Sequence, residues 1–325
     1  MIRSTPFFAL ERQMALASGG CQSPDFSLLV SSGDSRPPLA SVGLVLRGLV
    51  GVACLMAATL AHGQDSSTTS PSADEAKTVE PAPASIELFQ QEASEYEITL
   101  KNGRPATLNA TPVFKWANDV KNNQDGALFV WMQDDRPQVL GCVFTYYYQG
   151  QERRKHQFHS LATEGLSAAV DGVPVWQPAS SGLTFTTLLS AGNPETDPAK
   201  LKLQLRRLSR RFSAELEEEK GGSSELRLIP TPLLTYSPKK SDCLAGGVFA
   251  FATGTDPDLL LVLEARNTND QLAWNYAFAR FHYGRLTGKL DEAQVWQAPP
   301  EWAMKTDRRE NSAFRESHYV SLRTK

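Results

Sequence analysis

One phrase occurs twice in this chain, and the interval between its copies limits what the chain can fold into. The stretch DGVPVWQPAS at 171–180 returns as DEAQVWQAPP at 291–300, which is 120 residues later. At this constant offset, residues 106–178 and 226–298 align without a gap and are identical at 14 of 73 positions, well above the roughly 6% expected from average composition. We therefore expect an internal duplication in which both halves form the same elements.

The conserved spacing includes one large aromatic residue at the end of each half. Trp176 aligns with Trp296, and Gly126 aligns with Gly246 further upstream. A tryptophan on the last strand of a sheet can close the core of its half. We expect this core role for both tryptophans, with stacking on a ligand as the alternative.

Each half is predicted to begin with a helix and to continue as an antiparallel sheet. In the second half, Asp197 is a suitable N-cap, Pro198 suits the first helical turn, and an apolar stripe follows. That stripe consists of Leu201, Leu205, Leu208 and Phe212. Short turns such as KNGRP and QDDRP then join alternating segments, which makes successive strands antiparallel. In the first half these strands are expected at about 94–101, 105–109, 112–116, 126–133, 137–148, 155–162, 166–170 and 173–177.

The predicted fold class is therefore α+β with β dominant. It consists of two tandem copies of a helix followed by an antiparallel meander, packed with pseudo-two-fold symmetry so that each copy buries the open face of the other. The copies should occupy 85–180 and 195–298, and a polar tail should follow at 299–325.

The N-terminal part of the chain is predicted to direct export. Residues 1–63 form a leader whose apolar region at about 48–61 is followed by Ala61-His62-Gly63, which suits signal-peptide cleavage before Gln64. The alternative is an uncleaved membrane anchor near 42–61. Residues 64–84 are rich in Ser, Thr, Pro and acidic residues and predict a disordered spacer. We expect a periplasmic, envelope or secreted protein, with membrane contact only if the leader stays uncleaved.

Charge and motifs exclude several classes of function. The net charge of −3 gives no reason to expect a nucleic-acid partner. The sequence contains no phosphate-binding glycine loop, no G-x-S-x-G, no H-E-x-x-H and no C-x-x-C pair. We therefore predict no catalytic residue and no cofactor, and an enzyme is the less favoured class.

A basic and aromatic hairpin is the strongest candidate for a binding site. Its cations at 153–155 align with Ala273, Trp274 and Asn275, so this feature belongs to one copy only. The predicted ligand-binding residues are Arg153, Arg154, Lys155, Tyr146, Tyr148 and His159. Guanidinium groups and tyrosine faces suit an anionic or carbohydrate component of the envelope. The alternative is a solvated hairpin whose charges protect an exposed strand.

The two histidines of this hairpin are not predicted to bind a metal. His156 and His159 are three residues apart, and on a strand such positions point to opposite faces. No metal site is therefore expected.

Two residue pairs could be structural. Cys142 and Cys243 are the cysteines that remain after the leader, and they could form a disulfide in an oxidising compartment. The alternative is that Cys142, in the apolar run VLGCVF, is simply a small core residue. Glu264 and Arg280 could form a partly buried ion pair.

The chain also resembles a known family. The stretches GALFVWMQDDRP, HQFHSLATEGL and GGVFAFATGTDPDLLLVLEAR are similar to those of exported planctomycete-type proteins of unknown function, over roughly 84–298. The resemblance implies export, and it supplies no activity and no site residue.

Three functions remain open at this point. The leading hypothesis is an exported envelope domain that binds a ligand, polymer or protein partner without catalysis. The alternatives are a hydrolase acting on an envelope polymer or ester, and a purely structural domain. A deep pocket holding His159 or Glu264 beside a second titratable group would favour the hydrolase, whereas a shallow groove would favour binding.

Overall fold

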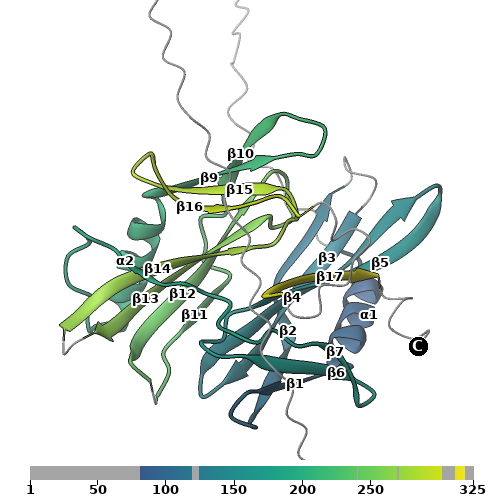
Figure 1. The fold of residues 1–325 in the computed structure, drawn as a ribbon, viewed down its shortest axis with the longest axis horizontal. Coiled ribbons are helices and arrows are strands. Elements are labelled where there is room, and N and C mark those ends of the chain that lie inside the picture. Colours follow the sequence, from purple (N-terminus) through teal and green to yellow (C-terminus); the bar gives the residue numbers. More distant parts are fainter. Residues whose placement is uncertain (1–80, 119–123, 240, 269–270, 302–311, 319–325) are drawn as a thin grey trace, which may run out of the picture. The chain divides into compact units, whose positions relative to one another are not determined.

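Two antiparallel sheets and two helices make up most of the chain that the structure describes (Figure 1). This computed structural model describes residues 81–118, 124–239, 241–268, 271–301 and 312–318. All of them belong to one unit that spans Thr69–Lys325. The predicted leader, its cleavage site and the spacer up to residue 80 lie outside the described residues. The fold is β-dominant, as the sequence predicted.

Sheet one has eight strands in the spatial order β17-β5-β4-β3-β2-β1-β6-β7. Its strands are β1 (Tyr96–Leu100), β2 (Pro105–Asn118), β3 (Gln124–Gln133), β4 (Arg136–Tyr148), β5 (Gln151–Ser160), β6 (Leu166–Val170), β7 (Val173–Trp176) and β17 (Phe314–His318). All pairings are antiparallel. The register of β2 against β3 shifts between Asn109 and Phe114, so one long irregular strand replaces the two short ones expected there.

Sheet two has nine strands in the order β16-β15-β9-β10-β12-β13-β14-β8, and β11 pairs separately with β12. Its strands are β8 (Thr186–Thr187), β9 (Phe212–Glu217), β10 (Ser223–Leu228), β11 (Leu234–Tyr236), β12 (Cys243–Ala252), β13 (Leu259–Thr268), β14 (Gln271–Arg280), β15 (Arg285–Leu290) and β16 (Ala293–Ala298). These pairings are antiparallel as well.

One helix precedes the first strand of each main meander. Helix α1 (Pro83–Ser94) buries Phe89 and Ala93. Helix α2 (Pro198–Ser209) confirms the predicted cap, because the Asp197 carboxylate accepts a hydrogen bond from the backbone N–H of Lys200 at 2.9 Å. Its leucine stripe is buried as expected. Among the described residues, no helix has the length and apolar character needed to cross a bilayer.

The hydrophobic side chains form three layers that follow the alternation of the strands. On β3, Phe129 faces the cluster that includes Phe89 of α1, whereas Leu128 faces a cluster that also contains Val248 and Leu260 of sheet two. On β12, Phe249 packs into the cluster beneath α2. Each sheet therefore has a helix on one face and the other sheet on its second face, as Figure 1 shows.

The C-terminal region differs from the prediction. Residues 299–325 were expected to form a polar tail, but Phe314–His318 form β17, which pairs with β5 at the edge of sheet one. Phe314 is 1% exposed, and the Glu316 carboxylate pairs with the Lys155 amine. Phe314–His318 are therefore part of the fold, because this strand buries an aromatic ring and pairs with a lysine.

A tight turn occurs at the predicted QDDRP stretch, and the second sheet contains a similar one. Asp134 and Asp135 have φ values of 49° and 61° between β3 and β4. Asp291 and Glu292, with φ values of 46° and 67°, form the corresponding type of turn between β15 and β16. Two successive residues with positive φ are typical of a two-residue hairpin.

Candidate functional site

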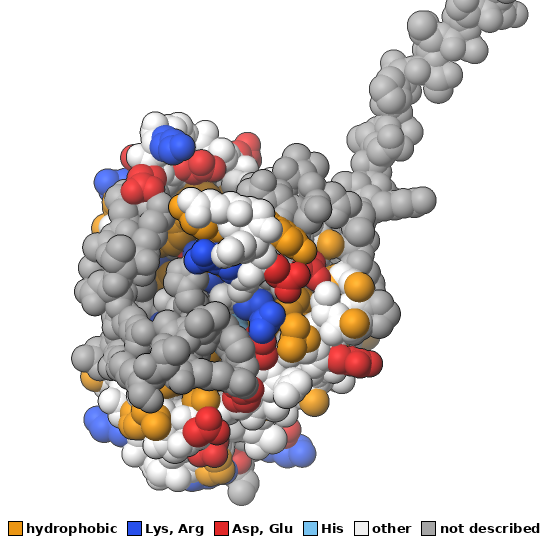
Figure 2. Space-filling view, turned by 90° about the vertical axis from the view of Figure 1, so that its right-hand side faces the viewer, with side chains coloured by type: hydrophobic (Ala, Val, Ile, Leu, Met, Phe, Trp, Pro, Cys, Tyr) orange, Lys and Arg blue, Asp and Glu red, His pale blue; other side chains and the backbone are white. Residues whose placement is uncertain are grey.

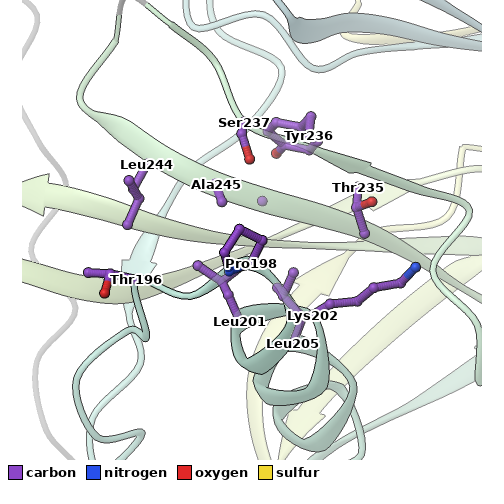
Figure 3. A pocket seen from close by; sticks show the side chains of 11 residues that line it. Thr196, Pro198, Leu201, Lys202, Leu205, Thr235, Tyr236, Ser237, Leu244 and Ala245 are labelled. Atoms are coloured by element: carbon purple, nitrogen blue, oxygen red, sulfur yellow. The ribbon is translucent and has the colours of Figure 1, made fainter.

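A pocket of about 450 Å³ opens between helix α2 and the edge of sheet two formed by β11 and β12 (Figure 3). Two segments that are about thirty residues apart in the sequence contribute its walls. The lining residues are Thr196, Pro198, Leu201, Lys202, Leu205, Thr235, Tyr236, Ser237, Leu244, Ala245 and Gly246. The pocket is therefore a tertiary feature.

The helix side of the pocket is fixed by the N-terminal half of α2. The Asp197 cap sets where the helix begins, and Leu201 and Leu205 then face sheet two from successive turns. Lys202 lies beside them on the exposed flank of the helix. The helix thus provides an apolar wall and one ammonium group.

The strand side depends on a glycine. A Cβ atom at Gly246 would lie 2.4 Å from the Tyr236 ring, which is too close for any side chain there. Tyr236 pairs with Gly246 across β11 and β12, so the ring crosses the backbone at this point. Gly246 therefore allows the tyrosine to pack against β12.

Tyr236 connects the pocket with the interior. The residue is 6% exposed, and its hydroxyl donates to Glu264 Oε1 at 2.7 Å. Burial, reinforced by the charge of Glu264, raises the pKa of Tyr236 well above its usual value. The hydroxyl stays protonated, and the ring is held in one position.

Glu264 is the centre of a buried ion network between the sheets. The carboxylate is fully buried and accepts from Arg136 of sheet one at 3.0 Å and from Arg266 at 3.1 Å. Arg266 also pairs with Asp242 at 2.6 Å. The network holds two cations and two carboxylates, so its charges balance.

This arrangement corrects one expected ion pair. Glu264 does not pair with Arg280, because the register of β13 and β14 places Asn275 opposite Glu264 and Leu259 opposite Arg280. Arg280 instead binds the Glu301 carboxylate at 2.7 Å. The sequence identified both residues as structural but assigned them the wrong partners.

Few polar groups line the pocket. Its polar groups are the Lys202 ammonium and the hydroxyls of Thr196, Thr235 and Ser237, besides the engaged Tyr236 hydroxyl. No carboxylate, imidazole or thiol is among the described lining residues. Across the described part of the chain, no group of three or more His, Cys, Asp or Glu residues could hold a metal ion.

The predicted hairpin site is formed by β4 and β5, and its aromatic and cationic residues do meet. The Arg153 guanidinium lies 5.3 Å from the centre of the Tyr148 ring, and the Lys155 amine lies 5.2 Å from that of Tyr146. Lys155 is also paired with Glu316 of β17. Figure 2 views the side of the molecule with β5 and α1, and cationic and acidic side chains are mixed on it. Arg153 is the exposed cation of this group.

Arg154 points to the other face of the hairpin, where it joins a buried network that the sequence did not suggest. Its Nε donates to Glu92 Oε1 of α1 at 2.6 Å. His156 Nε2 donates to the other carboxylate oxygen at 2.8 Å, so Nδ1 accepts from the Tyr96 hydroxyl at 2.6 Å. Burial, opposed by Glu92, lowers the pKa of His156. The alternation of side chains along a strand could have indicated this arrangement, because it places Arg154 and His156 on one face and Arg153 and Lys155 on the other.

His159 lies away from the other predicted site residues. It is 4% exposed, and its Nε2 donates to the Gly182 carbonyl at 3.1 Å. Burial lowers the pKa of His159 to about 4. It is a neutral core histidine in this structure.

The two cysteines are free and do not form the disulfide that the sequence allowed. Cys142 lies on β4 and Cys243 on β12, and both are buried in the cluster between the sheets. Burial raises the pKa of the Cys243 thiol to about 12 and that of Cys142 further. The alternative interpretation, a small core residue, describes Cys142.

Sequence patterns point only weakly to the pocket. The Gly246-Gly247 pair before the buried run VFAF indicates close approach of another group. Nothing in the sequence indicates that this group is Tyr236 or that Lys202 lies opposite. Comparison with protein-family models, curated proteins and solved structures finds no match to this chain.

Proposed function

We propose that this chain is an exported, non-catalytic binding domain whose ligand site is the pocket between α2 and the β11–β12 edge. The observation that carries the proposal is the pocket itself, which has about 450 Å³ of space, largely apolar walls and a single ammonium group. That chemistry fits a small molecule with an apolar body and one anionic group. Export rests on the predicted leader and on the resemblance to exported planctomycete-type proteins.

The dimensions and rigidity of the pocket support a binding role. Pockets for small ligands commonly measure about 300–1,000 Å³ and combine apolar walls with few polar groups. Leu201, Leu205 and Ala245 are buried side chains of regular elements, and Tyr236 is held by Glu264. Binding therefore requires little reorganisation of the walls, which favours affinity.

We also infer that the two halves are copies of one unit. When sheet two is read from β8 to β16 and sheet one from β17 to β7, strands at the same position correspond. For example, β14, β13 and β12 take the places of β5, β4 and β3. Phe158 and Trp176 have ring centres 5.9 Å apart at 33°, and Phe278 and Trp296, 120 residues later, are 5.5 Å apart at 31°. Corresponding strands thus carry corresponding ring contacts, which favours duplication.

Under this duplication, the pocket is a specialisation of the second copy. The helix and first strand of the two halves align at an offset of 116, with Leu100 of β1 opposite Leu216 of β9. Leu205 therefore corresponds to Phe89, a larger side chain that is fully buried. Ala245 corresponds to Asp125, which is hydrogen bonded to Ser85 of α1. A bulky ring and a polar contact therefore occupy the place in the first copy that is open in the second. Function that differs between copies is expected where the copies differ.

The alternative of a hydrolase has no comparable support. Neither His159 nor Glu264 lines the pocket. Glu264 is engaged by Arg136, Arg266 and Tyr236, and the buried His159 donates Nε2–H to the Gly182 carbonyl while its Nδ1 has no partner among the described residues. The hairpin remains a second predicted surface for an anionic or carbohydrate group, which Arg153 and Tyr148 would contact.

Calorimetric titration with decanoate and 1-decanol tests the proposal. Lys202→Gln should weaken decanoate binding about fivefold, because one exposed ion pair contributes up to about 1 kcal/mol, and it should leave 1-decanol binding unchanged. Lys200→Gln is the matched control, since Lys200 lies on the same helix outside this pocket. Thr235→Trp, at an exposed wall position, should weaken both ligands.

Two results would contradict the proposal. The wild-type protein could bind neither probe saturably. Alternatively, Thr235→Trp could leave the affinity for both probes unchanged, which would place any binding outside the pocket. Equal losses from Lys200→Gln and Lys202→Gln would mean that the ammonium group acts at a distance and does not contact the ligand.

A further inference from the structure

Helix α2 carries a second feature on the side that faces solvent. Residues 189–211 contain six cations but only two acids, Glu195 and Asp197. Helix α1, at the corresponding place, contains Glu87 and Glu92 and no cation. The basic character therefore belongs to the second helix alone.

Two cations of α2 and the arginine at its C-cap lie on one stripe, whereas Lys202 lines the pocket and Arg206 is half-buried. Lys200, Leu203, Arg207 and Arg210 follow one another at intervals of three and four residues and are all exposed. Lys200, Leu203 and Arg207 line one shallow depression of about 220 Å³, together with Gln204 and Glu195. We call the four-residue stripe the outer face of α2.

Within the described part of the chain, the cations on this face have no ion-pair partner. Among the described residues, no carboxylate lies within ion-pair distance of Lys200, Arg207 or Arg210, although other arginines of the chain are paired. Arg211, the next cation, is held by Asp291 at 2.5 Å. Asp197 is engaged as the helix cap. Among the residues that the structure describes, the outer face thus carries three cations without an ion-pair partner, and Glu195 is the acid that lies near them.

One exposed leucine lies on the outer face, and a second lies in the loop beside the C-terminal end of α2. Leu203, at the centre of the stripe, is 69% exposed, and Leu189 is 75% exposed. Arg211 Nη1 donates to the Ser190 carbonyl at 3.5 Å, so the loop with Leu189 lies beside the C-terminal end of α2. Burying a leucine side chain from water contributes roughly 1.5–3 kcal/mol. Leu203 and Leu189 remain exposed in the described structure, so burial against a partner would supply this free energy.

We propose that the outer face of α2, with Leu189, docks on a bilayer that contains anionic phospholipid. The ammonium and guanidinium groups would contact lipid phosphates, while Leu203 and Leu189 would enter the boundary between headgroups and acyl chains. A soluble anionic polymer would match the cations but would leave both leucines in water. The leucines are therefore the reason to choose lipid.

The docking proposal is independent of the pocket. It uses Lys200, Leu203, Arg207 and Arg210, none of which lines the pocket next to Tyr236. The pocket-blocking variant Thr235→Trp should bind vesicles like the wild type. Failure of either proposal therefore leaves the other open.

Vesicle co-sedimentation provides the test. The full chain without its leader should bind vesicles of equal parts phosphatidylglycerol and phosphatidylcholine and should not bind pure phosphatidylcholine. Lys200→Gln/Arg207→Gln/Arg210→Gln should lower the partition coefficient about 100-fold, since each surface cation contributes on the order of fivefold. The matched control is Lys101→Gln/Lys220→Gln/Arg227→Gln, which removes the same charge from exposed positions outside both α2 and the hairpin.

Leu203→Ser separates lipid docking from simple attraction of charge. It should lower binding to the anionic vesicles several-fold without changing binding to dextran sulfate, a soluble polyanion. The lipid proposal is wrong if both triple variants lose binding equally. It is also wrong if Leu203→Ser binds vesicles like the wild type, a result that would identify a general polyanion surface.

Discussion

Arg136 of sheet one and Glu264 of sheet two form a buried ion pair with an Nη2 to Oε1 distance of 3.0 Å. Arg136 also donates to the Leu161 carbonyl at 3.0 Å, and Glu264 accepts from Tyr236. The pair therefore connects the two sheets and, through Tyr236, supports the pocket. Each of the two buried charges thus has a further hydrogen-bond partner besides the ion pair, as a buried charge requires.

Arg136→Met should lower the free energy of unfolding by about 3–5 kcal/mol, because it removes one of the two cations that neutralise the buried Glu264 carboxylate and the one that comes from sheet one. Arg104→Met is the control: Arg104 pairs with Asp134 in the neighbouring turn, but that pair is exposed and should contribute less than about 1 kcal/mol. Urea denaturation measures both. Equal effects would show that Arg136 is not a structural connection.

Adjacent arginines of β5 should differ in the same way. Arg154→Gln should cost about 2–3 kcal/mol, since it removes the arginine from Glu92, whose carboxylate is 1% exposed. Arg153→Gln should change stability by less than about 0.5 kcal/mol, because Arg153 is exposed. Thermal unfolding of the two variants would decide the matter, and similar losses would refute this assignment of faces.

Acid should destabilise the protein through His159. The unfolded chain binds a proton on this histidine near its ordinary value of 6.5, whereas the folded pKa is about 4. The unfolded state therefore binds more protons between these values, and stability falls as the pH is lowered from about 6.5 to 4, by roughly 3 kcal/mol in total. His159→Gln should reduce the slope of unfolding free energy against pH in this window. An unchanged slope would mean that the folded protein protonates His159 freely.

Strand β17 should be required for the stability of sheet one. A stop codon after residue 311 removes Phe314, the Glu316 partner of Lys155, and the Ser312 carbonyl that accepts from the Trp176 indole at 2.7 Å. We expect a loss of at least about 3 kcal/mol. A stop codon after His318 retains the strand and is the control. Equal unfolding midpoints for the two truncations would contradict this role.

The two closing tryptophans should tolerate replacement differently. Trp176 is 1% exposed and hydrogen bonded, whereas Trp296 is only partly buried. Trp176→Phe should cost about 2 kcal/mol, and Trp296→Phe about 1 kcal/mol or less. Denaturation of both variants tests the difference. A larger loss for Trp296→Phe would reverse the assignment.

Local patterns in the sequence determined most of the elements. The cap at Asp197 and the leucine spacing after it specify α2, and alternating side chains with Asp and Gly turns specify hairpins such as β3–β4. These signals act over a few residues, so a sequence can express them directly. The tail was misjudged because β17 is short and polar, and its stability comes from pairing with a strand about 160 residues earlier.

The ion partners could not be predicted, because register and side-chain direction are set by long-range pairing. Glu264 and Arg280 are each buried and charged, as expected for a structural pair, yet their strands place them at different levels. The hairpin cations are adjacent in the sequence, and adjacent residues of a strand face opposite sides. Arg154 therefore pairs with Glu92 of α1, whereas Lys155 pairs with Glu316 of β17.

The sequence by itself determined a β-dominant chain with two helices and the positions of its turns, since these follow from local spacing and propensity. Only the tertiary structure decided where space remained. The pocket lies where Gly246 leaves room for the Tyr236 ring and where Leu201 and Leu205 of α2 face strands β11 and β12. A cavity is the volume that packing leaves unfilled, and that volume depends on contacts between segments that no local pattern connects.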